Sequence, residues 1–237
     1  MVGAGRFLFR YRAWIFPLVF ISILFVFRPR PYLPEPFYTL VIVAGFIVGL
    51  AGEVVRILTI GLDYIERGGK KGSPFASRLV RGGVYSHVRN PMYVGNLLMA
   101  VGVSLYAGDP WIMVTILPFF IFVYYAIVAA EENFLRAEFG AEYEDFCREV
   151  NRFCPSLRGF GETWASMTFN WKRPIEKDNG TAFYAFLGLT LLPLWRMHFL
   201  GHTDAFHAYQ PWAISISVVL FISYVIARTL AKTGRLK

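Results

Sequence analysis

Charged residues are scarce in this chain of 237 residues, because Asp, Glu, Lys and Arg together make up only 17% of it. A soluble domain usually carries about 25%. Hydrophobic residues reach 56%, and the mean hydropathy is +0.46. This balance excludes an ordinary soluble domain and indicates a single integral membrane domain over residues 1–237.

Cysteine is scarce as well, since only Cys147 and Cys154 occur. Their spacing, without a His nearby, is not that of a zinc motif. We expect both thiols to lie in a cytoplasmic loop, to stay reduced and to have structural or incidental roles. Basic patches interleaved with stacking aromatic residues are also missing, which excludes nucleic acid as a partner.

Potential metal ligands are few. His198, His202 and His207 lie close together in the sequence, but Asp204 is the only carboxylate among them. A metal site needs a convergent set of ligands with a defined geometry. We therefore expect no metal.

Six apolar segments approach the roughly 17–25 residues that a membrane-spanning helix needs. The sequence therefore predicts an all-α protein, a polytopic membrane bundle of about six transmembrane helices. The segments are residues 13–27, 38–60, 92–108, 110–130, 181–200 and 209–227.

The distribution of basic residues predicts the topology of this bundle. Twenty of the 24 Lys and Arg residues lie before the first segment, after the last, or in the long loops after the second and fourth. Arg28, Arg30 and Arg196 fall on the opposite side, and Arg56 lies inside the second segment. By the positive-inside rule, both termini and both long loops are cytoplasmic.

The sequence Ala-Gly-Asp-Pro predicts a tight turn between the third and fourth segments. Asp109 is a favourable N-cap, and Pro110 suits the first helical turn. The two segments should therefore pack antiparallel. This hairpin brings residues 87–96, at the start of the third segment, to the same cytoplasmic edge as Glu131 and Glu132.

The second segment carries Gly45, Gly49 and Gly52, which allow close approach of another helix. Glu53 and Arg56 are three residues apart, so they can pair on one face near its cytoplasmic end.

Two further cytoplasmic features are predicted. Apolar residues recur every three to five positions over residues 131–150, which indicates an amphipathic helix lying on the cytoplasmic face, with Gly140 as a candidate bend. The loop 61–83 is rich in glycine and is a candidate lid.

Polar residues crowd the start of the third segment, where His87, Arg89, Asn90 and Tyr93 bracket Pro91. Polar groups at membrane depth or at its edge are costly, so such a cluster is a functional-site hypothesis. Proline favours an extended backbone at the preceding residue, here Asn90, and this frees backbone groups for a ligand.

Two carboxylates and several aromatic rings should face this cluster across the hairpin. Glu131 and Glu132 can hold an ammonium group, and Tyr85, Tyr93 and Phe153 can cover an aromatic ring. Donors, paired carboxylates and aromatic walls suit a zwitterionic nucleoside amino acid, of which S-adenosylmethionine is one. Residue types alone also leave a membrane transporter open.

The order and spacing of the motifs are more specific. The chain carries in succession Gly83-Val84-Tyr85, Arg89-Asn90-Pro91-Met92-Tyr93-Val94-Gly95, Glu131-Glu132, Phe139-Gly140, Tyr143 and Val150-Asn151-Arg152-Phe153-Cys154-Pro155. This succession resembles the isoprenylcysteine carboxyl methyltransferase and phospholipid methyltransferase superfamily over residues 80–155, about a third of the chain. The common family pattern has Arg-His-Pro where this chain has Asn90 between Arg and Pro. An acid–base role at that position is in doubt because asparagine does not titrate.

The resemblance implies a membrane enzyme that binds S-adenosylmethionine on the cytoplasmic side. It implies methyl transfer to a lipid or lipophilic acceptor, such as a phospholipid amine or a prenylcysteine-like carboxylate. Residues 80–155 would be the methyltransferase-like core, and residues 1–60 and 180–237 would add transmembrane helices. Arg89 and Glu132 would be catalytic, orienting a carboxylate and assisting deprotonation of an amine. The implied cofactor site is Tyr85, His87, Val88, Arg89, Asn90, Pro91, Tyr93, Gly95, Asn96, Glu131, Glu132 and Phe153.

Other interpretations stay open at this point. A small hydrophobic thiol or amine can replace the lipid as acceptor. A transporter or scaffold would need a polar pathway to the membrane midplane, whereas the third, fourth and sixth segments carry no charge in their interiors. A reductase of the same fold would need a basic cluster for a nicotinamide cofactor, for which Lys70, Lys71 and Arg78 are candidates. The additional helices can shape an acceptor tunnel or a homo-oligomer interface.

Overall fold

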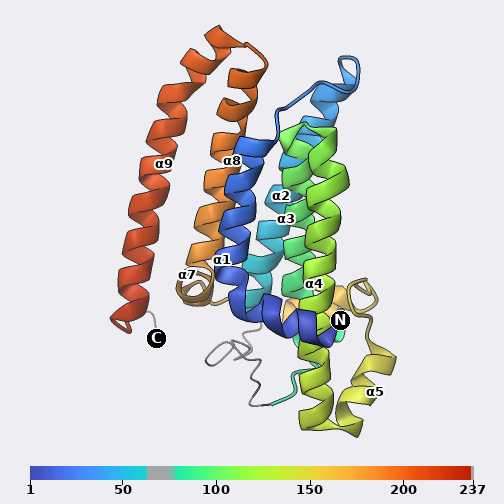
Figure 1. The fold of residues 1–237 in the computed structure, drawn as a ribbon. Helices are drawn as coiled ribbons and strands as arrows, with labels where there is room; N and C mark the ends of the chain where they lie inside the picture. The colour runs from blue at the N-terminus through green and yellow to red at the C-terminus, as the bar shows by residue number, and fades with distance from the viewer. Residues whose placement is uncertain (63–75, 77, 236–237) are drawn as a thin grey trace.

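The computed structural model describes residues 1–62, 76 and 78–235, and helices are the only regular elements in that part of the chain (Figure 1). The all-α fold class is confirmed. The elements are α1 (Val2–Val26), α2 (Phe37–Leu62), the 3-10 helix η1 (Gly83–Ser86), α3 (Pro91–Ala107), α4 (Pro110–Phe139), α5 (Ala141–Glu149), α6 (Phe160–Ser166), α7 (Lys172–Lys177), α8 (Asn179–Phe199) and α9 (Thr203–Lys232).

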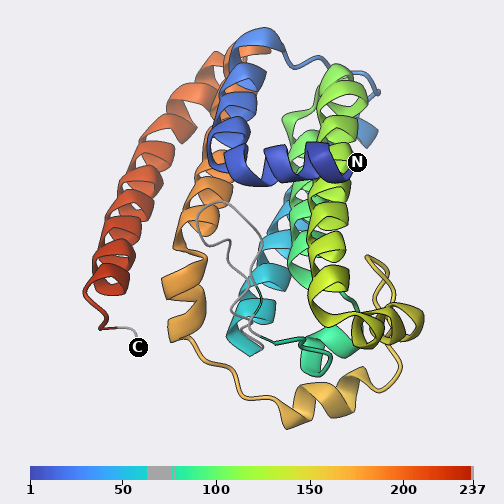
Figure 2. The same ribbon diagram turned by 60° about the horizontal axis from the view of Figure 1, so that its bottom comes forward.

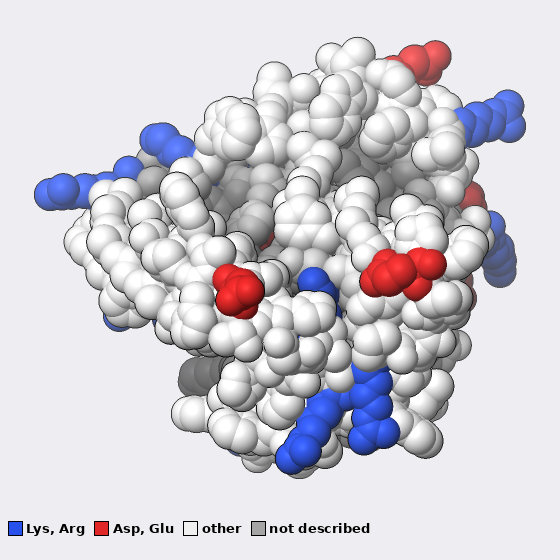
Figure 3. All heavy atoms as spheres, turned by 90° about the horizontal axis from the view of Figure 1, so that it is seen from above, with Lys and Arg blue, Asp and Glu red and all other residues white. Residues whose placement is uncertain are grey.

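The long helices run side by side as a bundle, with α9 on the outside against α8 (Figures 1 and 2). The short helices α5, α6 and α7 gather at one end, which we call the site end. The connections 27–36, 108–109 and 200–202 lie at the other end, which we call the loop end (Figure 1). Seen from above, the loop end shows only sparse charged side chains (Figure 3).

The six predicted spans all correspond to helices, but not all of them qualify as spans. In the described part of the chain, three helices (α2, α4 and α9) are long and apolar enough to cross a membrane, or four if the bent α1 is one span. The bend of 79° in α1 separates Val2–Arg12 from Trp14–Val26. Helix α3 is apolar but shorter, with 17 residues, and α8 is outside this group.

Glycine explains how closely α2 and α3 approach each other. A Cβ atom added at Gly102 would lie 2.1 Å from the Gly49 nitrogen, and one added at Gly52 would lie 2.6 Å from the Gly95 carbonyl oxygen. Both distances are too short for a side chain, so the backbones touch where only glycine fits. The predicted close approach of the second segment is confirmed.

The predicted hairpin between α3 and α4 is also confirmed. Gly108 ends α3 with a positive φ of 69°, a conformation that suits glycine. The Asp109 carboxylate caps α4, since its Oδ1 accepts from the amides of Trp111 and Ile112 at 2.7 and 3.3 Å. The start of α3 and the far part of α4 therefore lie at the same end of the bundle.

The segment 131–150 is not one amphipathic helix, which corrects the sequence-based expectation. Its first half continues α4 to Phe139, because no residue near Glu131 interrupts the helix. Gly140, with a φ of 53°, then breaks the chain, and α5 begins at Ala141. The predicted bend at Gly140 is a helix boundary. Most of the predicted lid at 61–83 lies outside the described residues, as do Lys70 and Lys71.

Candidate functional site

The segment that precedes α3 lies beside the segment that follows α5, at the site end of the bundle. The Arg89 amide donates to the Asn151 carbonyl at 2.9 Å, and the Ser156 amide donates to the His87 carbonyl at 2.9 Å. These hydrogen bonds hold the two segments together. Side chains from the segment before α3, from α4, from α5 and from the segment after α5 therefore converge. The predicted hairpin accounts for the meeting of the first two.

Glu132 is the centre of this convergence, with 1% of its surface exposed. Its Oε1 accepts from Nε and Nη2 of Arg89 at 3.3 and 3.2 Å. Arg152 donates from Nε to Oε1 at 3.1 Å and from Nη2 to Oε2 at 2.5 Å. Arg136 lies 3.9 Å from Oε2, and the Asn90 amide nitrogen lies 3.5 Å from Oε1. One carboxylate thus faces three guanidinium groups, although Arg136 also pairs with Glu144 at 2.8 Å. Positive charge therefore exceeds negative charge by one among these five charged side chains.

Arg89 is buried, and its third nitrogen, Nη1, caps the C-terminal end of helix α5. Its Nη1 donates to the carbonyl oxygens of Cys147 and Val150 at 2.9 and 2.5 Å. The last carbonyls of a helix lack partners within the helix, so this guanidinium caps α5 and ties it to α4. The fork of Arg89 is therefore engaged within the protein.

Arg152, like Arg136, is a member of this cluster that sequence reasoning did not assign to the site. Its side chain is 27% exposed, and its guanidinium lies over the Tyr125 ring at 5.1 Å from the centroid. The hydrogen bond to Glu132 raises the pKa of the Arg152 guanidinium, so Arg152 stays charged. Its place in the Asn151-Arg152-Phe153 motif was the signal that pointed to it.

Asn90 is buried at the N-cap position of α3, before Pro91. Its φ of −130° is extended as expected, but its ψ of 58° is not, so the expectation of an extended residue is only half right. Its side chain makes no capping bond to α3. Instead Nδ2 donates to the Arg152 carbonyl at 3.3 Å, because the Glu132 cluster lies on that side.

Tyr93 and Glu131 form a second contact one turn further along. The Tyr93 hydroxyl donates to Glu131 Oε1 at 2.7 Å. The Tyr93 ring packs against a cluster of Phe9, Val123 and Ile127. The first half of α1, which crosses α4 in Figure 2, therefore helps to position Tyr93.

His87 joins the site to α6. Its Nδ1 lies 2.8 Å from the Ser156 carbonyl oxygen and its Nε2 lies 2.9 Å from Thr163 Oγ1. A carbonyl oxygen only accepts, so Nδ1 carries the proton, and Nε2 of a neutral ring accepts from the Thr163 hydroxyl. The ring also meets Phe160 edge-on at 5.2 Å. His87 is therefore a buried residue that links the segment before α3 to α6.

The other residues that sequence reasoning placed in the site fall into two groups. Tyr85 and Val88 are each 3% exposed, and Tyr85 belongs to an apolar cluster with Leu135 and Phe146. They support the site from the core. Phe153 lies nearer to the Glu132 cluster, because its ring is 6.3 Å from that of Tyr125, which the Arg152 guanidinium covers.

Gly95 and Asn96 face α2 instead. A Cβ at Gly95 would lie 2.6 Å from Cγ of Arg56, and Asn96 Oδ1 accepts from Arg56 Nη1 at 2.6 Å. The predicted pair of Arg56 with Glu53 has a separation of 3.8 Å. The stronger partner of Arg56 is Asp178, at the start of α8, which sequence reasoning missed. This Arg56 cluster is separate from the Glu132 cluster.

These features define a helical membrane protein with a buried arginine–glutamate site at one end of its bundle. The family model for phospholipid methyltransferase matches residues 40–142, which include most of α2 and all of α3 and α4. This match and the relatives below support the family that the motifs indicated, at low sequence identity.

Two curated relatives are the probable protein-S-isoprenylcysteine O-methyltransferases of Oryza sativa subsp. indica and subsp. japonica. Each is 28% identical over 125 residues, which are 51% of this chain and 64% of the relative. The cobalt-zinc-cadmium resistance protein CzcN of Cupriavidus metallidurans is 30% identical over 116 residues, 48% of this chain and 51% of that protein. The chain thus spans less than two thirds of the length of these relatives. No solved structure matches it.

Proposed function

We propose that this protein is an integral membrane methyltransferase that uses S-adenosylmethionine and transfers a methyl group to a lipid or lipophilic acceptor. The observation that carries the proposal is the buried cluster of Glu132, Arg89 and Arg152. It is assembled from the segments whose order resembles the methyltransferase superfamily. The family match supports a membrane methyltransferase. The cofactor is inferred from the site and from the resemblance, and the lipophilic acceptor is inferred from the resemblance alone.

The donor set fits the charged groups of S-adenosylmethionine. Positive charge is in excess around Glu132, which suits the carboxylate of the cofactor. The partly exposed Arg152 can donate to it from Nη1, because Glu132 engages Nε and Nη2. Glu131 offers a carboxylate for the ammonium group. Tyr125 and Phe153 offer aromatic surfaces for the adenine ring.

When bound, the cofactor supplies a methyl group already activated by its sulfonium. The protein has to align the acceptor with that methyl group and to exclude water. Glu132 serves this alignment as a positioning residue, because its oxygens are engaged by guanidinium groups. Arg89 acts in the same way through its cap on α5. The roles first implied for these two residues, contact with reacting groups, are thereby reassigned to holding the site together.

The topology in this proposal has six transmembrane helices, with α3 and α8 completing the set and the site end facing the cytoplasm. The support is the charge distribution, because the loop end carries only three of the 24 basic residues. Residues 80–155 form the methyltransferase-like core. Residues 1–60 and 180–237 contribute the remaining helices.

Calorimetric titration of the purified protein in detergent with S-adenosylmethionine and S-adenosylhomocysteine tests the proposal. The wild-type protein should bind both. The Arg152→Gln variant should bind at least about tenfold more weakly, because a lost charge-assisted hydrogen bond costs roughly 1.5–3 kcal/mol. Arg158→Gln is the matched control, since Arg158 is exposed and makes no side-chain contact with Glu132.

Transfer of a radiolabelled methyl group from the cofactor into an extract of membrane lipids is the second measurement. Label in the lipid fraction supports a lipid acceptor, whereas label only in small hydrophobic thiols or amines identifies the alternative. Monodisperse wild-type protein that binds neither cofactor form would overturn the proposal. Titration with nicotinamide cofactors would then test the reductase interpretation.

A further inference from the structure

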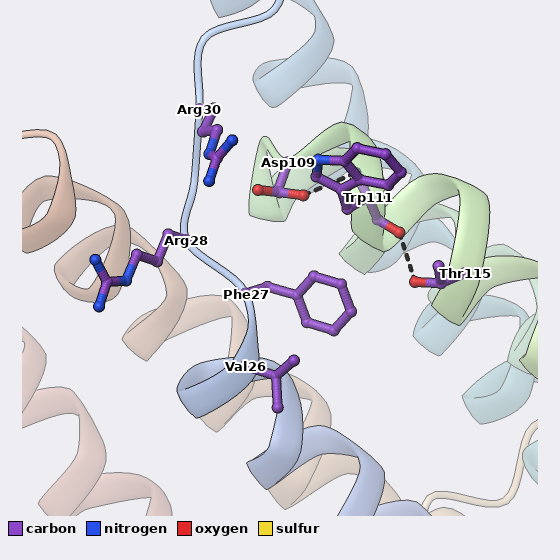
Figure 4. Close-up of a pocket in the computed structure, with 7 residues that line it drawn as sticks. All are labelled: Val26, Phe27, Arg28, Arg30, Asp109, Trp111 and Thr115. Carbon is purple, nitrogen blue, oxygen red and sulfur yellow. Dashed lines mark hydrogen bonds between the residues drawn. The ribbon is translucent and has the colours of Figure 1, made fainter.

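A cavity lies at the loop end of the bundle, away from the Glu132 cluster. It has a volume of about 400 Å³ and lies between the end of α1 and the start of α4 (Figure 4). Ligand pockets in proteins have volumes of about 300–1,000 Å³, so this one can hold a polar headgroup. Figure 4 shows the segment that carries Arg28 and Arg30 passing beside Asp109 and Trp111.

Charged residues of both signs line this cavity. Its lining includes Arg28, Arg30 and one carboxylate, Asp109. The carboxylate is 1% exposed and is engaged by two amides of α4. Arg30 has neither an ion pair nor a hydrogen bond with any residue that the structure describes, and the guanidinium of Arg28 lies 5.8 Å from the Phe199 ring centroid. Figure 4 shows the Arg28 side chain pointing away from Asp109 and Trp111, whereas Arg30 points toward them. The Arg30 guanidinium therefore faces the cavity without a partner among the described residues, which suits an anion.

The remaining lining is apolar and continues into the lipid-facing surface. Val26 and Trp111 line the cavity and are 70% and 58% exposed. Their neighbours Phe25 and Val114 are 83% and 62% exposed, so an apolar surface runs from the cavity along both helices. Tryptophan is enriched where a membrane meets water. An anion bound here would have apolar surface directly below it.

We propose that this cavity binds the headgroup of an anionic phospholipid from the leaflet at the loop end. The phosphodiester lies at Arg30, and the acyl chains follow α1 and α4. The Arg30 guanidinium provides charge-assisted hydrogen bonds to phosphate oxygens. The site is independent of the methyltransferase proposal, because the lipid is a ligand at the opposite end and not the methyl acceptor.

The bound lipid joins α1 to the start of α4, where these helices diverge around the cavity. Occupancy should therefore raise the thermal stability of the protein. The test uses the full chain purified in a non-ionic detergent and titrated with dioleoylphosphatidylglycerol, dioleoylphosphatidylcholine or inorganic phosphate. Phosphatidylglycerol should raise the unfolding midpoint in a saturable manner. Phosphatidylcholine should act much more weakly, because its headgroup has no net charge, and phosphate alone should have no effect.

Two variants and one control make the test specific to this cavity. The double variant Arg28→Gln/Arg30→Gln should weaken the apparent affinity for phosphatidylglycerol at least tenfold. Thr115→Trp keeps both arginines but fills the cavity, since Thr115 is part of its lining, and should cause a similar loss. Arg228→Gln, which removes an exposed arginine at the far end of α9, should respond like the wild type.

Several results would overturn the proposal. One is a wild-type response in the double variant or in Thr115→Trp. Another is an equal response to phosphatidylcholine, because the charge would then not be recognised. An equal response to inorganic phosphate would identify a site for a free anion instead of a lipid. If the double variant does not fold, Thr115→Trp still decides the question.

Discussion

Replacing Arg56 by Met should destabilise the bundle, whereas replacing Glu53, one helical turn away, by Gln should not. Arg56 and Asp178 are 6% and 1% exposed, and they form an ion pair between α2 and the start of α8. Arg56 also donates to Asn96 at 2.6 Å and to Thr181 at 3.3 Å. It therefore connects three helices at a depth where unpaired charge is costly.

The expected magnitudes follow from what each change leaves behind. Arg56→Met leaves the Asp178 carboxylate buried without its counter-ion, which costs about 3–5 kcal/mol. At about 2–4 °C per kcal/mol for a chain of this size, the unfolding midpoint should fall by roughly 6–20 °C. Both carboxylate oxygens of Glu53 are already buried without a hydrogen-bond partner. Gln preserves the shape and removes a charge, so the change in stability should stay within about 1 kcal/mol.

Thermal unfolding of the purified variants in one detergent is the assay. The double variant Arg56→Met/Asp178→Leu should recover part of the loss, because replacing both partners of a buried pair leaves no orphan charge. If Glu53→Gln lowers the midpoint as much as Arg56→Met, Glu53 has a partner that the structure does not show. If the double variant loses the sum of its single changes, the ion pair does not form.

Two further changes test other parts of the molecule. Glu132→Gln leaves three guanidinium groups facing a neutral amide. It should abolish cofactor binding and cost about 2–4 kcal/mol, less than a fully buried pair because Arg152 and Arg136 are partly exposed. Calorimetry and thermal unfolding measure the two effects, and a midpoint equal to that of wild type would contradict the positioning role given to Glu132. Gly102→Ala places a Cβ 2.1 Å from the Gly49 nitrogen and should cost at least about 1–3 kcal/mol through overpacking. Gly3→Ala is its control in the same unfolding assay, since a Cβ there meets nothing within 4 Å; equal midpoints in the two variants would refute the close helix contact.

Local signals in the sequence were sufficient to predict several parts of the fold. The cap by Asp109, the first-turn Pro110 and the positive φ of Gly108 are all decided by neighbouring residues, so the hairpin could be predicted. The glycines of α2 were also informative, because small residues in a membrane helix indicate close packing. The meeting of Arg89 with Glu132 followed from that hairpin geometry.

Other features depend on contacts that no local pattern encodes. Arg152 and Glu132 are separated by 20 residues, and Arg56 and Asp178 by 122, so each partner is chosen by the fold. The boundary of α4 was misplaced for a related reason. Hydropathy falls near Glu131, where the helix leaves the apolar bundle, but the backbone continues to Phe139 because hydropathy does not end a helix.

The N-terminal half of α3 connects the two polar clusters. Tyr93 reaches Glu131, and Asn96, three residues later, reaches Arg56. Contacts with α2 and α8 on one side, and with α4 on the other, therefore fix the rotation of α3 about its axis. This rotation also sets the positions of Asn90 and Arg89, which precede the helix. Two residues that complete these clusters, Arg152 and Asp178, lie beyond the family match that ends at residue 142. The geometry of the candidate site thus depends on segments of this chain that the family match does not cover.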